Sequence, residues 1–289
     1  MNIELALTID DIPRNGHTII PNSNLNVVQG LTNIFKLYKL PPVYGFANCS
    51  LAESSSGYEL LQHWLETGNK LGNHTYSHLD LRNVSLEEYL NDIEKNDIFL
   101  SKISGNKDYN YCKYFRYPYL LEGETKEKYR GIKKYLNDNN YKITQVTIDF
   151  LDFAWEQPLL NCLRANNAEL LDELKKLYVD TAISKLLTAH KAANEIFQRN
   201  IKHVLVVHSC LATAMFLEKV IQEYKENGVK FISLSEAIMD PVYETEINVI
   251  SDIGPNFLRK IVIERKLDLL NKPTVPTKRL KEIEQYSSV

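Results

Sequence analysis

Two adjacent carboxylates at the end of the first apolar run are the residues best placed to do chemistry. Residues 5–9 read as a strand, and Asp10 and Asp11 follow them directly. Because side chains alternate along a strand, the two carboxylates leave the backbone in different directions. One of them can therefore bind a metal ion while the other stays available as a general base.

Two histidines four residues apart supply matching ligands. His74 and His78 would share a face on one helical turn and could bind one ion, although two histidines alone could also be structural. Together with Asp11 they would form a three-ligand site with an open position for water. One carboxylate and two imidazoles suit zinc, and iron, cobalt or nickel would bind similarly. The sequence therefore predicts one divalent metal ion.

Further polar residues follow strand-like runs later in the chain. Arg116 lies in a proline-containing turn, and Asp149 and Asp152 precede Trp155. His208 ends an aliphatic run, where a histidine is by default a buried structural residue. The constellation, rather than any one of these residues, favours a general acid at His208.

In this order the residues resemble the polysaccharide deacetylase family, the NodB-like carbohydrate esterases of family 4. These enzymes remove N- or O-acetyl groups with a bound divalent metal. The family motifs are T-F-D-D, H-x-x-x-H, R-x-P-Y, D-x-x-D with a nearby Trp, and L-x-x-H, and here they run from Thr8 to His208. Ile9 replaces the Phe of the first motif, and Trp155 lies three residues after Asp152 rather than beside it.

The resemblance implies a catalytic role for several residues. It makes Asp10 the general base, although the sequence alone leaves open which of Asp10 and Asp11 binds the metal and whether Asp10 is merely a capping carboxylate. Arg116 would pair with the base and favour its charged form. His208 would protonate the leaving amine or alcohol. Asp152 would orient His208 or Arg116, with Asp149 as the competitor for that role.

The resemblance also implies substrate contacts. The backbone N–H of Tyr119 would donate to the oxyanion, together with the metal. Trp155 and Tyr119 could form the wall of a sugar groove, although a core position for Trp155 is the alternative. Leu205, the first residue of L-x-x-H, is expected to contact substrate. The loops over residues 50–57, 122–126 and 157–169 are expected to form the rim of the site.

Strand-like and helical segments alternate along the chain, which predicts an α/β fold with parallel β-α-β units. Strands are expected over residues 3–9, 43–47, 114–117, 141–149, 203–207 and 230–233, and the motifs fall at their carboxyl ends, as in α/β barrels. A long helical stretch over 159–200 is expected to bend or split near Asn166 and Asn167. The resemblance implies a distorted (β/α)7 barrel.

The chain divides into a predicted barrel domain over residues 1–243 and a helical tail over 244–289. A helix is expected over 257–270, before the prolines at positions 273 and 276. The tail is expected to pack on the barrel or on a partner subunit, with no chemistry of its own. This leaves a homo-oligomer as one expected assembly.

Composition excludes several classes of protein. The 289 residues are 44% hydrophobic and carry a net charge of −3 with no basic block, which argues against nucleic-acid binding. No apolar run reaches membrane-spanning length. Four scattered cysteines favour buried thiols over disulfides or a cysteine-type zinc site. Because the first strand begins at once, a cytoplasmic protein is expected, or a periplasmic or secreted one if a leader has been removed.

The predicted function is metal-dependent hydrolysis of acetyl groups on an N-acetylated amino sugar or polysaccharide, such as a chitooligosaccharide or peptidoglycan. The alternative is hydrolysis of a non-sugar amide, cyclic amide or formamide on the same fold. A third hypothesis is an inactive carbohydrate-binding relative, against which the intact motif residues argue. A long open groove would favour a polymer, and a capped pocket a small molecule.

Overall fold

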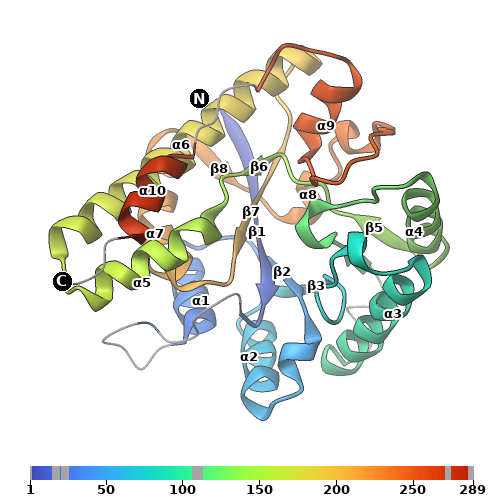
Figure 1. Ribbon diagram of the computed structural model, residues 1–289, viewed down its shortest axis with the longest axis horizontal. Helices are drawn as coiled ribbons and strands as arrows, with labels where there is room; N and C mark the ends of the chain where they lie inside the picture. Colours follow the sequence, from blue (N-terminus) through green and yellow to red (C-terminus); the bar gives the residue numbers. More distant parts are fainter. Residues whose placement is uncertain (1, 15–19, 21–25, 106–112, 271–274, 286–289) are drawn as a thin grey trace.

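The protein folds around one curled parallel sheet with helices on its outer side (Figure 1). The computed structural model describes residues 2–14, 20, 26–105, 113–270 and 275–285. Within these residues the strand order is β5-β4-β3-β2-β1-β7-β6, and β8 pairs with the first residues of β1. The predicted class, a distorted α/β barrel, is confirmed. The described sheet has eight strands, and the single strand expected over 141–149 is in fact two short ones.

The long first strand lies at the centre of this sheet and carries Asp10 and Asp11 near its carboxyl end. Its neighbours are β2 and β8 on one edge and β7 on the other. The strands are β1 (Ile3–Ile12), β2 (Tyr44–Ala47), β3 (Lys70–Asn73), β4 (Lys113–Phe115), β5 (Tyr141–Ile143), β6 (Ile148–Asp149), β7 (His203–His208) and β8 (Val229–Phe231).

Alternation along β1 separates the core beneath the helices from the interior of the barrel. Leu5, Leu7 and Ile9 belong to the large outer core, which the helices cover. Ala6 belongs to a smaller inner cluster with Phe46, Tyr114 and Val204 from neighbouring strands. The next inward positions along β1 are Thr8 and Asp10, so the polar residues lie above an apolar floor.

The outer helices begin and end largely where sequence signals place them. Asn26 and Ser85 form capping boxes at the starts of α1 and α3. The predicted break near Asn166 is confirmed, because Asn166 has a positive φ of 48° and Asn167 caps the next helix through the N–H of Leu170. These helices are α1 (Val27–Leu37), α2 (Ser55–Glu66), α3 (Leu86–Ile103), α4 (Lys126–Asp138), α5 (Glu156–Arg164), α6 (Ala168–Phe197), α7 (Leu211–Glu226) and α8 (Leu234–Ala237).

Short 3-10 helices follow several strands and carry residues that matter for the site. They are η1 (Cys49–Ala52), η2 (Leu81–Asn83), η3 (Pro118–Leu120), η4 (Asp152–Trp155) and η5 (Pro241–Glu244). Within η3 the backbone of Tyr119 is left-handed, with a φ of 57° and a ψ of 13°.

The C-terminal tail adds two helices, α9 (Phe257–Glu264) and α10 (Thr277–Glu284). The expected helix over 257–270 ends early, and Lys266 just beyond it has a φ of 52°. In Figure 1, α10 lies beside α5 on the left and α9 lies at the upper right. Phe257, Leu258 and Ile261 are buried against the rest of the chain. The division into a barrel domain and a tail stays a prediction.

The cysteines Cys49, Cys162 and Cys210 are free and buried, as expected, while Cys112 lies outside the described residues. Across the described part of the chain, no helix is both long and apolar enough to cross a membrane.

Candidate active site

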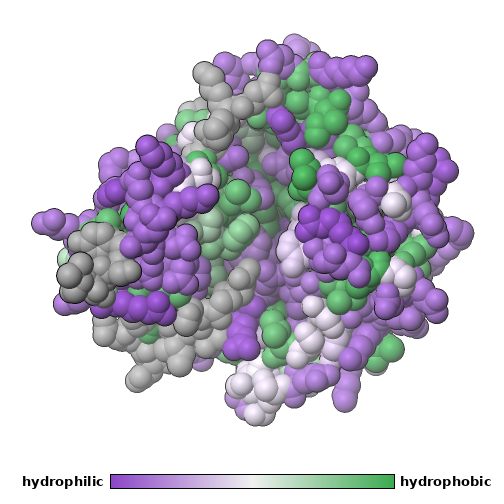
Figure 2. Space-filling model, viewed as in Figure 1, coloured by the Kyte–Doolittle hydropathy of each residue, from purple (hydrophilic) through white to green (hydrophobic). Residues whose placement is uncertain are grey.

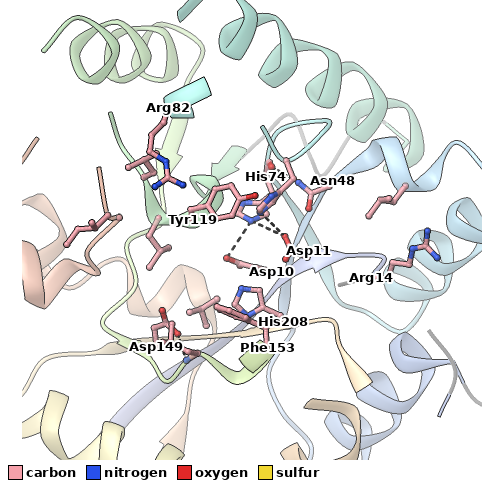
Figure 3. Close-up of a pocket in the computed structure, with 18 of the residues that line it drawn as sticks. Asp10, Asp11, Arg14, Asn48, His74, Arg82, Tyr119, Asp149, Phe153 and His208 are labelled. Atoms are coloured by element: carbon pink, nitrogen blue, oxygen red, sulfur yellow. Dashed lines mark hydrogen bonds and ion pairs between the residues drawn. The ribbon is translucent and has the colours of Figure 1, made fainter. Parts of the chain in front are cut away.

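A pocket of about 610 Å³ opens over the carboxyl ends of β1, β3 and β7. Figure 3 shows the predicted residues Asp10, Asp11, His74 and His208 gathered at its centre, with Arg82 and Arg14 on opposite sides. The face shown in Figure 2 is largely hydrophilic and is hollowed near its middle, where hydrophobic residues lie along the sides of the hollow.

A bulge in β1 brings both adjacent aspartates into the pocket. The register between β1 and β2 shifts between Ile9 and Ile12, and Asp11 has a left-handed φ of 61°. In a regular strand the two side chains would point to opposite faces, and a bulge redirects one of them. Asp10 and Asp11 therefore both line the pocket, although they are consecutive in sequence.

His74 and His78 meet Asp11 through a loop, so the predicted helical turn is wrong. The chain leaves β3 after Asn73 and passes through left-handed residues at Thr75 and His78, with φ values of 60° and 53°. The side chain of Asn73 accepts the N–H of Thr75 at 2.9 Å, which favours a turn over a helix. The loop places both imidazoles on one side despite the helical spacing.

The donor set of this cluster fits a divalent cation. The Nε2 atoms of His74 and His78 lie 3.4 and 3.2 Å from Asp11 Oδ1, and one ligand atom from each residue lies within 4.8 Å of the others. His74 Nδ1 lies 2.7 Å from the carbonyl oxygen of Arg116. Because a carbonyl oxygen only accepts, Nδ1 carries a proton, and Nε2 is the ring atom that faces the cluster.

The charge states also suit a cation. Burial alone would raise the pKa of Asp11, but contact with His74 and the nearby imidazoles lowers it below the ordinary value. Burial lowers the pKa of His78, and the neighbouring His74 lowers it further. At neutral pH the cluster therefore presents one carboxylate and an unprotonated imidazole at His78.

Asp10 is paired with a buried arginine, Arg116, that directly follows β4. Nη1 of Arg116 lies 3.2 Å from each carboxylate oxygen of Asp10, and both side chains are almost completely buried. Nε of Arg116 donates to the carbonyl oxygen of Thr144 at 2.8 Å, and its guanidinium lies 4.5 Å from the ring of Phe46. These contacts fix the arginine beneath the carboxylate, as the resemblance implied.

His208 is paired with a buried carboxylate, Asp152. Its Nδ1 lies 2.7 Å from Asp152 Oδ1, and its backbone N–H donates to Asp152 Oδ2 at 2.7 Å. Burial alone would lower the pKa of His208, but the charge and hydrogen bond of Asp152 raise it to about 10. Asp149, the competitor, instead accepts the N–H of Leu151 and lines the pocket.

Two predicted substrate residues do not reach the pocket. Trp155 has no exposed surface and packs edge-on against Phe150 and Tyr178, so its place in a sugar groove is wrong. η4 turns Phe153 toward the pocket instead, where its ring lies 5.0 Å from that of His208.

Leu205 is also wrong as a substrate contact, because the strand period of two places it on the opposite face from His208. It is 1% exposed and belongs to the outer core. The residue of β7 that lines the pocket is Val206, two positions before His208.

Tyr119 lines the pocket as expected and is 53% exposed. Its ring lies 4.6 Å from that of His78, so the turn after β4 touches the cluster of Asp11, His74 and His78. The proposed use of its backbone N–H as an oxyanion donor stays a prediction.

Most of the other residues that line the pocket could not be predicted from the sequence. Of the three loops expected there, the first contributes Leu51, whereas neither residues 122–126 nor residues 157–169 line the pocket. The missed residues come from scattered elements, and spacing in the sequence gave no signal for them: Arg14, Asn48, Arg82, Leu120, Leu121, Leu151, Phe153, Val206, Asp252, Ile253 and Gly254.

The fold and the site together define a distorted α/β barrel with a pocket at the carboxyl ends of its strands, where charged side chains gather. The sequence profile of the family described as polysaccharide deacetylase matches residues 2–143, which carry both aspartates, both histidines and Arg116. The segment over residues 2–143 belongs to this polysaccharide deacetylase family.

A curated relative is the peptidoglycan-N-acetylglucosamine deacetylase of Bacillus cereus. It is 24% identical over 234 residues, which cover 80% of this chain and 66% of the relative. The chain thus spans about two thirds of that protein's length.

Two solved structures share the fold. The chitin deacetylase of the fungus Colletotrichum lindemuthianum aligns with a TM-score of 0.54 and 19% identity, over 81% of this chain and 86% of its own. A family 4 pseudoenzyme from Bacillus anthracis aligns with a TM-score of 0.55 and 16% identity, over 82% and 66%. Because one neighbour is an enzyme and the other a pseudoenzyme, the fold alone does not decide activity.

Proposed function

We propose that the protein is a metal-dependent deacetylase acting on an N-acetylated amino sugar or its polymer. The observation that carries the proposal is the pairing of two reactive groups beside one metal-binding cluster. Asp10 and His208 face each other across neighbouring strands, where their Cα positions are paired in the sheet. Each has a buried partner of opposite charge.

Asp11, His74 and His78 would hold the metal ion. One carboxylate with two imidazoles favours zinc among the divalent ions. A bound ion would polarise the acetyl carbonyl and lower the pKa of a coordinated water.

The residues of this chain supply the proton transfers. Asp10 takes the proton of the attacking water, with Arg116 holding its carboxylate in place. His208 donates a proton to the leaving nitrogen. Because Nδ1 of His208 is bonded to Asp152, the transferable proton is on Nε2, which is directed away from Asp152. The N–H of Tyr119 would donate to the oxyanion.

An acetylated amino sugar is the substrate class that the relatives support. Peptidoglycan-N-acetylglucosamine and chitin appear in the names of two of them. A cavity of about 610 Å³ has the size of a small-ligand site and exceeds what one acetyl group needs. The substrate would therefore place at least a sugar ring inside the rim.

Acetate release, measured with metal content over a panel of acetylated sugars and oligomers, tests this proposal. The wild type should release acetate from at least one N-acetylated sugar, and a chelator should abolish that release. His74→Ala should lose most of its metal and its turnover. His63→Ala is the matched control, because His63 bonds Thr32 away from the pocket and should keep both. Full metal occupancy in His74→Ala, or no acetate release by the metal-loaded wild type, would overturn the proposal.

A further inference from the structure

The C-terminal tail contributes one wall of the pocket. Asp252, Ile253 and Gly254 line it, although they follow His208 by more than forty residues. Gly254 has a left-handed φ of 56°, and a Cβ atom there would lie 2.0 Å from the carbonyl oxygen of Tyr119. Only glycine allows this close approach, so the tail segment lies directly against the turn that carries Tyr119.

Several contacts hold this segment in place. Nη1 of Arg82 donates to the carbonyl oxygen of Asp252 at 3.1 Å. The backbone N–H of Ser251 donates to the carbonyl oxygen of Gly123 at 3.3 Å. At the start of α9, the N–H of Phe257 donates to the carbonyl oxygen of Val146 at 2.8 Å. The wall is therefore anchored on both sides of Ile253.

A buried ion pair between Lys260 on α9 and Glu122 also attaches the tail to the barrel. Lys260 is 4% exposed, and its Nζ lies 2.5 Å from Glu122 Oε1 and 3.0 Å from Gln145 Oε1. A buried, hydrogen-bonded ion pair is costly to break, which keeps α9 in register with the barrel.

Ile253 is exposed despite this firm anchoring. Its side chain is 76% exposed, and it lines the pocket with other exposed apolar residues. A group of exposed large apolar side chains around a polar centre is typical of a binding surface. The other members, each between 37% and 53% exposed, are Leu51, Tyr119, Leu151 and Phe153.

We propose that Ile253 is a specificity-determining residue, whose side chain binds the apolar C–H face of a sugar ring next to the reacting acetamido group. This rests on the proposed deacetylase function. A pyranose ring has C–H bonds on its faces and hydroxyl groups at its edge, so an apolar wall contacts one face and leaves the hydroxyls in water. Ile253 lies outside the proton-transfer pairs and would act through binding alone.

The test compares Ile253→Ser with a matched exposed isoleucine elsewhere. Ile98 on α3 is 66% exposed and does not line the pocket, so Ile98→Ser is the control. Ile253→Ser should raise KM for an N-acetylated oligosaccharide about tenfold, as loss of an apolar contact in a pocket does, with kcat within about twofold. Ile253→Val should have a KM close to that of the wild type, and the KM of Ile98→Ser should equal the wild-type value.

Two negative results would mean different things. If Ile253→Ser kept the wild-type KM, or if Ile98→Ser raised KM equally, the inference about Ile253 would be overturned while the deacetylase function stood. If the wild type itself released no acetate from any acetylated sugar, the proposed function would fall, and this inference with it.

Discussion

The two groups that we propose as base and acid are held by opposite arrangements. On β1, the reactive group is a carboxylate, Asp10, and its buried partner is the cation Arg116. On β7, the reactive group is an imidazole, His208, and its buried partner is the anion Asp152. In each pair the buried partner carries the charge opposite to that of the reactive group, an arrangement that suits the proposed base and the proposed acid.

The two partners differ in how they are themselves held. Arg116 donates to backbone and threonine oxygens and lies over the ring of Phe46. Asp152 accepts from the backbone N–H of His208 and from the hydroxyl of Thr213, at 2.7 and 2.6 Å. The acid side is therefore a chain of short hydrogen bonds, whereas the base side depends mainly on one bulky cation. Variants on the two sides should fail in different ways.

Removing the base should have the largest effect. Asp10→Asn keeps the size of the side chain but cannot accept the proton of water, and general-base contributions are about 10²–10⁴-fold. Turnover of an N-acetylated sugar should fall by that factor, with metal content unchanged. If Asp10→Asn lost metal while Asp11→Asn kept it, the roles of the two aspartates would have to be exchanged.

Neutralising the partner of the acid should change the pH dependence. Asp152→Asn removes the charge that raises the pKa of His208 to about 10, and burial then lowers that pKa toward or below its ordinary value of about 6.5. The basic limb of the kcat profile should move down by several pH units. At pH 8 turnover should fall about 10- to 100-fold, and near pH 6 much less. A basic limb that stays in place would contradict the assignment.

The same pair predicts a pH dependence of stability. The folded-state pKa of His208 is raised, so its contribution to stability is fully present below about pH 6.5 and is lost as pH rises through about 10. Thermal unfolding of the wild type and of His208→Gln should therefore differ most at pH 6 and least above pH 10. A difference that grows with pH would contradict the sign.

Removing the hydrogen bond that Thr213 donates to Asp152 should have the smallest effect on turnover. Thr213→Val removes the hydroxyl that donates to Asp152 Oδ2, leaving that buried oxygen with one donor fewer. We expect kcat to fall about tenfold, with KM little changed. Thr213→Ser, which restores the hydroxyl, should recover most of the loss. If valine and serine variants lost activity equally, packing rather than the hydrogen bond would be responsible.

The centre of the site could be predicted from the sequence because it depends on strand ends. Parallel strands bring their carboxyl ends to one edge, so Asp10, Arg116 and His208 had to meet once their strands were recognised. The pairing of Asp152 with His208 rather than with Arg116 could not be decided, since it depends on the turn of η4.

The wrong predictions concern local geometry that spacing does not determine. A shift of one position along a strand places the side chain on the opposite face of the sheet. For this reason Val206 lines the pocket and Leu205 does not. Within η4, Phe153 faces the pocket and Trp155 the core. Spacing of four residues is compatible with a loop as well as with a helix, as His78 shows. The tail wall at Ile253 depends on tertiary contacts that leave no sequence pattern.

The most direct test of the account is the effect of His208→Ala on two kinds of substrate. An amide releases an amine that needs a proton, whereas an activated aryl acetate releases an anion that does not. The variant should keep its metal, because His208 lies outside the proposed metal site of Asp11, His74 and His78. We predict a loss of about 10²–10⁴-fold on an N-acetylated sugar and a much smaller loss on the aryl acetate. Equal losses on both substrates would show that His208 stabilises the oxyanion or the fold and does not donate the proton.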